Sequence, residues 1–425
     1  MNWTRVITTC ALGLFGSFAA LPTRAADAYP APPTIKAAAA VVLDGDSGQI
    51  LFERNAHARR APASTTKVMT SLLAVESGLL DEYVTVSKRA ASIGESTIYL
   101  KEGERLTLRQ LTYGVLLSSG NDASTAVAEF LGGGSEARFI EMMNARAESL
   151  GMKDTHFNNP HGLPGDNHYS SAYDLSLLLK EATRHDTWNQ IAETKWKKIP
   201  GFGKPEGRTL RNHNKTLWNY PHATGGKTGY TNAAGRCFVG SAKRGKRRVI
   251  QTVMASSDLW NETHALLSYG LDNFENVALA REGEIVGTVP IHAGSSRVVE
   301  VIAPRDVTVS VPKGQTERIA LQQVWQLPDA LVAPINVRQP VGQLIVRQGD
   351  RVLQNVPLVA AASVTVAVTP WETLTSWFFP GMLTASLLSL WRFKGLRRRR
   401  FAASALPKAS AGGIKNKRAT VRKTV

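Results

Sequence analysis

The chain has 425 residues, a length that allows two to three domains. Its net charge of +17 is concentrated at one end: residues 392–425 contain twelve Lys/Arg and no Asp/Glu, and removing these twelve charges leaves +5 for the rest. The overall charge is therefore no argument that the folded part of the chain binds nucleic acid, and we expect no nucleic-acid partner.

The first 26 residues have the pattern of a secretory signal peptide. Arg5 precedes an apolar run over residues 10–21, and small residues around Ala25 offer a cleavage site. Removal of residues 1–26 leaves Cys237 as the single cysteine, so we expect no intramolecular disulfide although export would permit one.

The next region mixes strand and helix patterns. Residues 39–43 and 50–53 are strand-like, and the Gly- and Asp-containing segment between them predicts a hairpin turn. Helical patterns follow at 64–77, 107–117, 123–131 and 136–150, and strand patterns return around 227–230 and 248–254. Early strands, central helices and late strands predict an α+β domain, over residues 27–275, with an antiparallel sheet flanked by helices.

Three short motifs occur in order within this region: Ser64-Thr65-Thr66-Lys67, Ser119-Gly120-Asn121 and Lys227-Thr228-Gly229. A serine hydroxyl is a weak nucleophile until a neighbouring base takes its proton. Ser64 and Lys67 are three residues apart, which on a helix places their β-carbons roughly 5–6 Å apart on one face. A helix N-terminus also favours a developing oxyanion. Lys67 can act as the base if its pKa falls, and Lys227 is a candidate for the cation that lowers it.

Each motif alone has a plainer interpretation. A Ser-x-x-Lys string occurs by chance about once in a chain of this length, Ser-Gly-Asn is a common turn, and Lys-Thr-Gly also fits a strand end with a surface lysine. The three motifs together, in this order, are nearly the same as the signature of class A β-lactamases and penicillin-binding proteins, in which the second motif is Ser-Asp-Asn. The combination therefore predicts a serine enzyme.

The residues around the motifs resemble those of the low-molecular-mass penicillin-binding proteins, which are serine D-alanyl-D-alanine carboxypeptidases. Four blocks carry the resemblance: residues 63–70 (A-S-x-T-K-x-M-T), 119–123 (S-G-N-D-A), 157–163 (F-x-N-P-x-G-L) and 168–175 (similar to H-x-S-A-x-D-L). The likeness is strong over residues 35–275 and weaker over 276–366. It implies the serine β-lactamase/transpeptidase-like fold for the catalytic domain.

The resemblance also implies a mechanism. Ser64 would attack the carbonyl between the two terminal D-alanines of a peptidoglycan stem peptide and form an acyl-enzyme, with Lys67 accepting its proton. Ser119, with Asn121 beside it, would relay a proton to the departing D-alanine. Water would then hydrolyse the ester, while β-lactam antibiotics would acylate the same serine and leave slowly.

Substrate binding is assigned by the same resemblance. Lys227, Thr228 and Gly229 would hold the substrate carboxylate, and the backbone N–H groups of Ser64 and Tyr230 would form the oxyanion hole. Relatives often carry a substrate-contacting arginine at a position that we align with Asn261, so carboxylate binding in this chain would depend more on the Lys-Thr-Gly motif. No metal or organic cofactor is implied.

Three other functions are compatible with parts of the sequence. A class A β-lactamase would share the motifs but needs a glutamate-activated water, and no E-x-x-L-N string lies between the second and third motifs. A DD-endopeptidase that cuts cross-links would use the same residues. A non-catalytic wall-binding scaffold would bind peptidoglycan without releasing D-alanine. The histidines are too loosely spaced to predict a metal site.

The C-terminal part changes character. Residues 276–366 contain short alternating strand patterns, such as that of Val307, Val309 and Val311, which predict a small all-β domain without catalytic residues. Residues 367–396 include a run from 373 to 391 without charge, which predicts a membrane-anchoring segment.

The last segment, residues 397–425, predicts a basic disordered tail that contacts anionic membrane lipids. Whether the anchoring segment spans the bilayer or lies on it is open. In either case we expect an exported protein that is held by its C-terminus at the extracytoplasmic face of a bacterial cell membrane.

Overall fold

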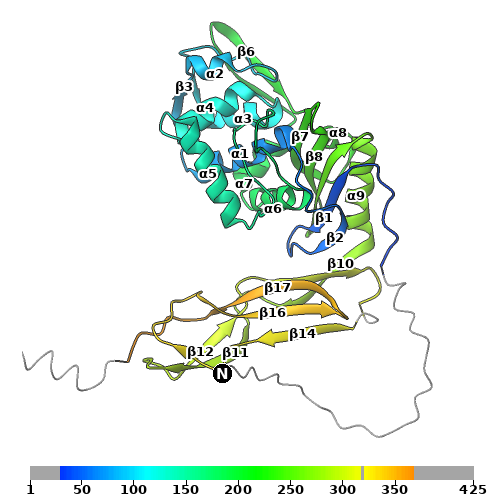
Figure 1. Ribbon diagram of the computed structural model, residues 1–425, viewed down its shortest axis with the longest axis vertical. Helices are drawn as coiled ribbons and strands as arrows, with labels where there is room; N and C mark the ends of the chain where they lie inside the picture. Colours follow the sequence, from blue (N-terminus) through cyan, green and yellow to red (C-terminus); the bar gives the residue numbers. More distant parts are fainter. Residues whose placement is uncertain (1–28, 317–319, 368–425) are drawn as a thin grey trace, which may run out of the picture.

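A computed structural model describes residues 29–316 and 320–367, which form an N-terminal α+β domain and a C-terminal β domain (Figure 1). The predicted signal peptide, the basic tail and all but the first residue of the predicted anchoring segment lie outside the described residues. Within the described ranges, no helix combines the length and the apolar character needed to cross a membrane.

The N-terminal domain is built on a five-stranded antiparallel sheet in the order β2-β1-β9-β8-β7. The strands are β1 (Ala39–Asp44), β2 (Ile50–Arg54), β7 (Ala223–Thr231), β8 (Gly235–Arg244) and β9 (Arg247–Ser256). The predicted early hairpin is confirmed as β1–β2, and β1 pairs on its other side with β9. The start of the domain is thereby joined to its end.

Both faces of the sheet are covered, and β1 shows how the sequence achieves this. All six of its residues are buried. Successive side chains of a strand point to opposite faces. Ala39, Val41 and Leu43 therefore enter the core formed with the main group of helices, whereas Ala40 and Val42 enter a second core under α9 (Leu259–Asn273).

The helices on the first face surround α1 (Lys67–Glu76), whose residues are buried from its start to Ala74. It contacts five other helices: α3 (Leu108–Leu117), α4 (Asn121–Leu131), α5 (Glu136–Ser149), α6 (Ala172–Ala182) and α7 (Asp186–Glu193). The smaller elements are α2 (Lys88–Ser92), α8 (Thr216–Asn219) and the hairpins β3 (Tyr83–Thr85)–β4 (Arg105–Thr107) and β5 (Trp196–Gly201)–β6 (Lys204–Arg211). The helices predicted at 107–117, 123–131 and 136–150 are confirmed within two residues at each end.

The helix predicted at 64–77 differs in one respect. Residues Ala63–Thr66 form a 3₁₀ turn, η1, and the α-helix begins only at Lys67. A 3₁₀ turn has three residues per turn, so side chains at i and i+3 eclipse each other. This local geometry places the first and last residues of the Ser-x-x-Lys motif directly one above the other, on the same side of the turn.

The C-terminal domain is all-β, as predicted. Its strands are β10 (Phe274–Ala280), β11 (Ile285–His292), β12 (Val298–Ile302), β13 (Val307–Pro312), β14 (Leu321–Gln326), β15 (Leu331–Val332), β16 (Pro340–Gln348) and β17 (Arg351–Ala360). Six of them form the sheet β14-β16-β17-β12-β11-β15, and β10 pairs with β13. The alternating Val307, Val309 and Val311 lie on β13 and point into the core of this domain.

Specific contacts join the two domains. The side chain of Gln49, only 3% exposed, donates to the backbone oxygen of Ser310 and accepts from its backbone N–H, both at 2.8 Å. The Ser310 hydroxyl donates to Asn276, which also accepts from Arg247. These hydrogen bonds satisfy polar groups that the domain interface buries.

Candidate active site

Ser64 lies in the 3₁₀ turn and points toward Lys67. The Lys67 Nζ lies 2.9 Å from the Ser64 Oγ, within hydrogen-bond distance. Ala63, directly before the serine, is buried and has a φ of 48°, a left-handed conformation that is costly for a residue with a side chain. The backbone that carries the nucleophile candidate is thus held in a strained turn by its surroundings.

Lys67 is completely buried and has two further hydrogen-bond acceptors. Its Nζ donates to Asn121 Oδ1 and to the backbone oxygen of His161, both at 2.7 Å. Burial, followed by the nearby charge of Lys227, lowers the pKa of Lys67 well below its usual value. A neutral amine keeps two N–H donors, which suit Asn121 and His161, and gains a lone pair that can accept the Ser64 hydroxyl proton.

The second motif leads into the N-terminus of α4. Ser119 is 5% exposed and has a φ of 59°, and Asn121 is the first residue of the helix. The Asn121 side chain donates to Gly94 O at 2.9 Å while its oxygen faces Lys67. The next residue, Asp122, accepts from the backbone N–H groups of Ile98 and Leu100. Asn121 and Asp122 thereby hold the 94–100 segment beside Lys67.

The third motif lies on β7, which runs directly against the 3₁₀ turn. A β-carbon on Gly229 would lie 3.0 Å from the backbone nitrogen of Ser64 and 3.1 Å from the β-carbon of Ala63. Only a glycine permits this approach without displacement. Lys227 is 1% exposed, donates to Thr228 O at 3.0 Å, and has its pKa lowered to about 7 by burial.

A cleft of about 420 Å³ opens above these groups. Of the predicted site residues, Ser64, Ser119, Thr228, Gly229 and Tyr230 line it. Lys67 and Asn121 are connected to Ser64 by the hydrogen bonds given above, and Lys227 precedes Thr228 on β7. The structure therefore brings all eight predicted residues together from three distant segments of the chain.

Four residues whose side chains could contact a substrate line the cleft without belonging to any motif: Glu95, His213, Arg236 and Trp260. Asn261 is not among the lining residues, and its amide donates to Asp258 at 3.0 Å. Arg236 lies opposite Tyr230 in the β7–β8 register. The cleft thus contains an arginine, Arg236, which comes from β8 and not from position 261, where the sequence comparison placed the arginine of relatives. The short turn between β7 and β8 was the signal that could have revealed it.

Two buried histidines support the nucleophile turn. Burial lowers the pKa of His168 to about 4 and that of His161 to about 3, so both rings are neutral near pH 7. The His168 Nε2 lies 3.0 Å from the Thr66 hydroxyl, and its Nδ1 accepts from Asn158 N. The loop that carries the His161 carbonyl is thereby attached to the start of α1.

Gly162 sets how closely that loop can approach. It has a φ of 87°, and a β-carbon there would lie 1.9 Å from Ala63 O and 2.9 Å from Ser64 N. We expect Gly162→Ala to lower the free energy of unfolding by about 2–4 kcal/mol and to slow acylation, because it adds both strain and a backbone clash. Thermal unfolding and penicillin labelling measure the two effects.

Gly78→Ala is the matched control for this variant. Gly78 has a similar φ of 72°, but a β-carbon there would meet nothing within 4 Å. The control should therefore show only the cost of the left-handed conformation, about 1 kcal/mol. Equal losses of stability in the two variants would contradict the steric argument.

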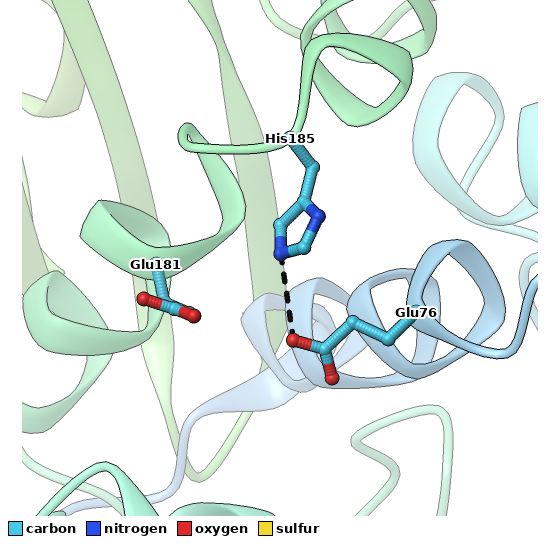
Figure 2. Close-up of side chains that lie close together, drawn as sticks. All are labelled: Glu76, Glu181 and His185. Carbon is cyan, nitrogen blue, oxygen red and sulfur yellow. Dashed lines mark ion pairs between the residues drawn. The ribbon is translucent and has the colours of Figure 1, made fainter. Parts of the chain in front are cut away.

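A separate group of ligand-type side chains, Glu76, Glu181 and His185, lies at the other end of α1 (Figure 2). The His185 Nε2 is 3.4 Å from a Glu76 oxygen. However, the Arg146 guanidinium pairs with both carboxylates, reaching Glu181 at 2.8 Å, and Arg184 also pairs with Glu181. These cations neutralise the carboxylates, so the group is an ion-pair network that joins α1, α5 and α6.

Comparisons with known proteins agree with the geometry. Residues 26–258 match the family model described as D-alanyl-D-alanine carboxypeptidase, and residues 274–366 match the model described as the C-terminal domain of penicillin-binding protein 5. The chain is 33% identical to the D-alanyl-D-alanine carboxypeptidase DacF of Bacillus subtilis over 333 residues, covering 76% of this chain and 85% of that protein. It is 33% identical to DacD of Escherichia coli over 380 residues, covering 85% and 95%.

Solved structures show the same relationship. The crystal structure of penicillin binding protein 5 from Haemophilus influenzae superposes with a TM-score of 0.67 and 29% identity, covering 79% of this chain and 99% of that one. Penicillin binding protein 6B from Escherichia coli gives a TM-score of 0.59 at 31% identity, covering 78% and 97%. These likenesses include both domains. The chain belongs to the D-alanyl-D-alanine carboxypeptidase family of low-molecular-mass penicillin-binding proteins.

Proposed function

We propose that this chain removes the terminal D-alanine from peptidoglycan stem pentapeptides by a serine acyl-enzyme mechanism, and that β-lactam antibiotics acylate the same serine. Family membership supports the reaction class. The observation that carries the mechanism is the contact between Lys67 and Ser64 at 2.9 Å, made by a lysine that is fully buried beside a second lysine.

Acylation begins when neutral Lys67 takes the Ser64 proton and the Ser64 oxygen attacks the carbonyl carbon of the penultimate D-alanine. The backbone N–H groups of Ser64 and Tyr230 stabilise the oxyanion of the tetrahedral intermediate. The C–N bond then breaks, and the proton passes from Lys67 by way of Ser119 to the amine of the leaving D-alanine. Ser119 lines the same cleft as Ser64, as this relay requires.

Deacylation completes the cycle. Water attacks the ester carbonyl, its proton passes to Lys67, and the Ser64 oxygen recovers a proton as it leaves. Asn121 orients Lys67 throughout, because its Oδ1 accepts from the Lys67 Nζ at 2.7 Å.

A pentapeptide ending in D-Ala-D-Ala should release one D-alanine per molecule. The same peptide ending in L-Ala should release none, and equal release from both would contradict the proposal.

Two alternative activities, β-lactam hydrolysis and DD-endopeptidase cleavage, can be distinguished from carboxypeptidase activity by the substrate that each turns over. A β-lactamase would turn nitrocefin over rapidly, whereas a carboxypeptidase should give a burst of one equivalent followed by slow hydrolysis. An endopeptidase would cleave a cross-linked peptide dimer at a rate comparable with D-alanine release. We expect the dimer to be the poorer substrate. Rapid steady-state nitrocefin hydrolysis would replace our assignment with the β-lactamase alternative.

We assign the recognition of the substrate carboxylate to Lys227, Thr228 and Gly229. A Lys227 pKa of about 7 predicts that the ammonium is charged below that pH and loses its charge above it. The kcat/KM for the peptide should therefore decline on the alkaline side from about pH 7. In Lys227→Arg the alkaline decline should disappear, because a guanidinium stays charged. An unchanged alkaline limb in this variant would show that another group causes it.

We also propose that the protein acts outside the cytoplasm and that its C-terminal segment attaches it to anionic lipid. The basic tail and the uncharged run before it support this location. Deleting residues 368–425 should yield a protein that stays in the supernatant with vesicles containing phosphatidylglycerol and retains penicillin labelling. Sedimentation of the truncated protein with the vesicles would place the attachment elsewhere.

A further inference from the structure

A polar cavity of about 740 Å³ lies at the junction of the two domains, away from the catalytic motifs. Seven Lys/Arg and three Asp/Glu side chains line it. A second cavity of about 570 Å³ adjoins it, because Lys180 and Arg305 line both. Lys180 comes from α6 of the N-terminal domain, and Arg305 comes from the connection between β12 and β13.

The cations of this interdomain cavity exceed the carboxylates that are free to pair with them. Glu282 is paired with Arg338 at 3.0 Å, and Asp306 accepts the backbone N–H of Glu282 at 2.9 Å. Asp46 is the remaining carboxylate of the lining, and its single charge offsets only part of the charge of the cations around it. Within residues 29–316 and 320–367, no carboxylate lies within 4.0 Å of the charged group of Lys180, Arg248 or Arg305. The cavity therefore has an excess of positive charge.

The positive groups are also partly buried and repel each other. Burial lowers the pKa of Lys180 and the charge of Arg305 lowers it further, while Asp44 and Asp46 offset part of the shift. Burial likewise lowers the pKa of Arg305, and Arg184 adds to the effect. The Lys180 Nζ lies beside Gly48, where an added β-carbon would be 2.9 Å from it. Cations that are held together at this cost are relieved by a bound anion.

We propose that the interdomain cavity binds a multivalent oxyanion of the phosphate class, held by Lys180 and Arg248 from the N-terminal domain and by Arg305 from the β domain. Guanidinium groups match the tetrahedral oxygens of phosphate with paired donors, and the charge excess favours an anion with more than one negative charge. Because the ligand contacts both domains, it stabilises their observed orientation. The anion comes either from solution or from a lipid headgroup.

The test is calorimetric titration of the full-length protein with inorganic pyrophosphate, with sodium chloride used to keep ionic strength constant. Lys180→Gln and Arg305→Gln should each weaken binding at the interdomain cavity about tenfold, because each removes one charge-assisted contact. Arg297→Gln, which removes an exposed arginine of the β domain outside both cavities, should leave binding unchanged. The basic tail is the same in all variants, so their differences report on the cavity.

Vesicle sedimentation separates the two sources of the anion. If a lipid headgroup is the ligand, Lys180→Gln and Arg305→Gln should reduce binding to vesicles that contain phosphatidic acid, whose phosphate monoester can carry two charges, relative to Arg297→Gln, and if the anion is free they should not. The proposal is overturned if neither variant differs from Arg297→Gln in either assay. Penicillin labelling of each variant verifies that it is folded, and the use of one variant from each domain protects the test against a folding defect in either.

Discussion

Ser64→Ala is expected to abolish both covalent penicillin labelling and D-alanine release while the protein stays folded. The substitution removes the only atom that forms the acyl-enzyme, and removal of the nucleophile from a comparable catalytic group costs roughly 10⁶-fold in kcat. Ser64 is only partly buried, so loss of its hydroxyl opens no cavity in the core. Fluorescent penicillin labelling, release of D-alanine and thermal unfolding measure the three quantities.

Ser118→Ala is the matched control for this variant. Ser118 is the residue beside Ser119, and its hydroxyl contacts Arg211 O at 3.4 Å rather than any catalytic group. The control should keep wild-type labelling and release. D-alanine release by purified Ser64→Ala at a measurable fraction of the wild-type rate would remove Ser64 from its assigned role.

Lys67→Ala is expected to slow acylation by about 10³–10⁴-fold or more, because a nucleophile and its base act as one unit. The variant also leaves Asn121 Oδ1 and His161 O without the buried donor that each now has. We therefore expect a loss of roughly 1–3 kcal/mol in the free energy of unfolding. Stopped-flow acylation by a chromogenic β-lactam gives the rate, and chemical denaturation gives the stability.

Two comparisons distinguish the loss of the base from the loss of packing. Lys88→Ala, an exposed lysine on α2, should match the wild type in both measurements. Gly162→Ala should lose stability of the same order as Lys67→Ala with a smaller effect on the acylation rate. If the rates of these two variants fall in proportion to their stabilities, Lys67 supports the structure and is not the base.

The sequence contained much of the information about this site. The order of the motifs predicted that Ser64, Asn121 and Lys227 meet, and some motif residues are there because they permit the close contact of backbone segments. Gly229 is an example, because its missing side chain lets β7 approach Ser64. The alternation of Val307, Val309 and Val311 likewise predicted β13, since successive side chains of a strand point to opposite faces.

Other features could not be predicted from residue types. The third hydrogen-bond partner of Lys67 is the backbone oxygen of His161, and a carbonyl has no signature in the sequence. The 3₁₀ turn around Ser64 depends on tertiary contacts with Gly162 and Gly229 rather than on local propensity. Glu95 reaches the cleft from a loop, a position that only the three-dimensional fold determines.

The central claim is that the buried pair of lysines, Lys67 and Lys227, activates Ser64 as the nucleophile that forms a covalent acyl-enzyme. Its most direct test is to incubate the full-length protein with benzylpenicillin, digest it, and locate the adduct by tandem mass spectrometry. We predict one adduct per chain, on Ser64, in the wild type and none in Ser64→Ala. An adduct on any other residue, or its persistence in Ser64→Ala, would contradict the mechanism.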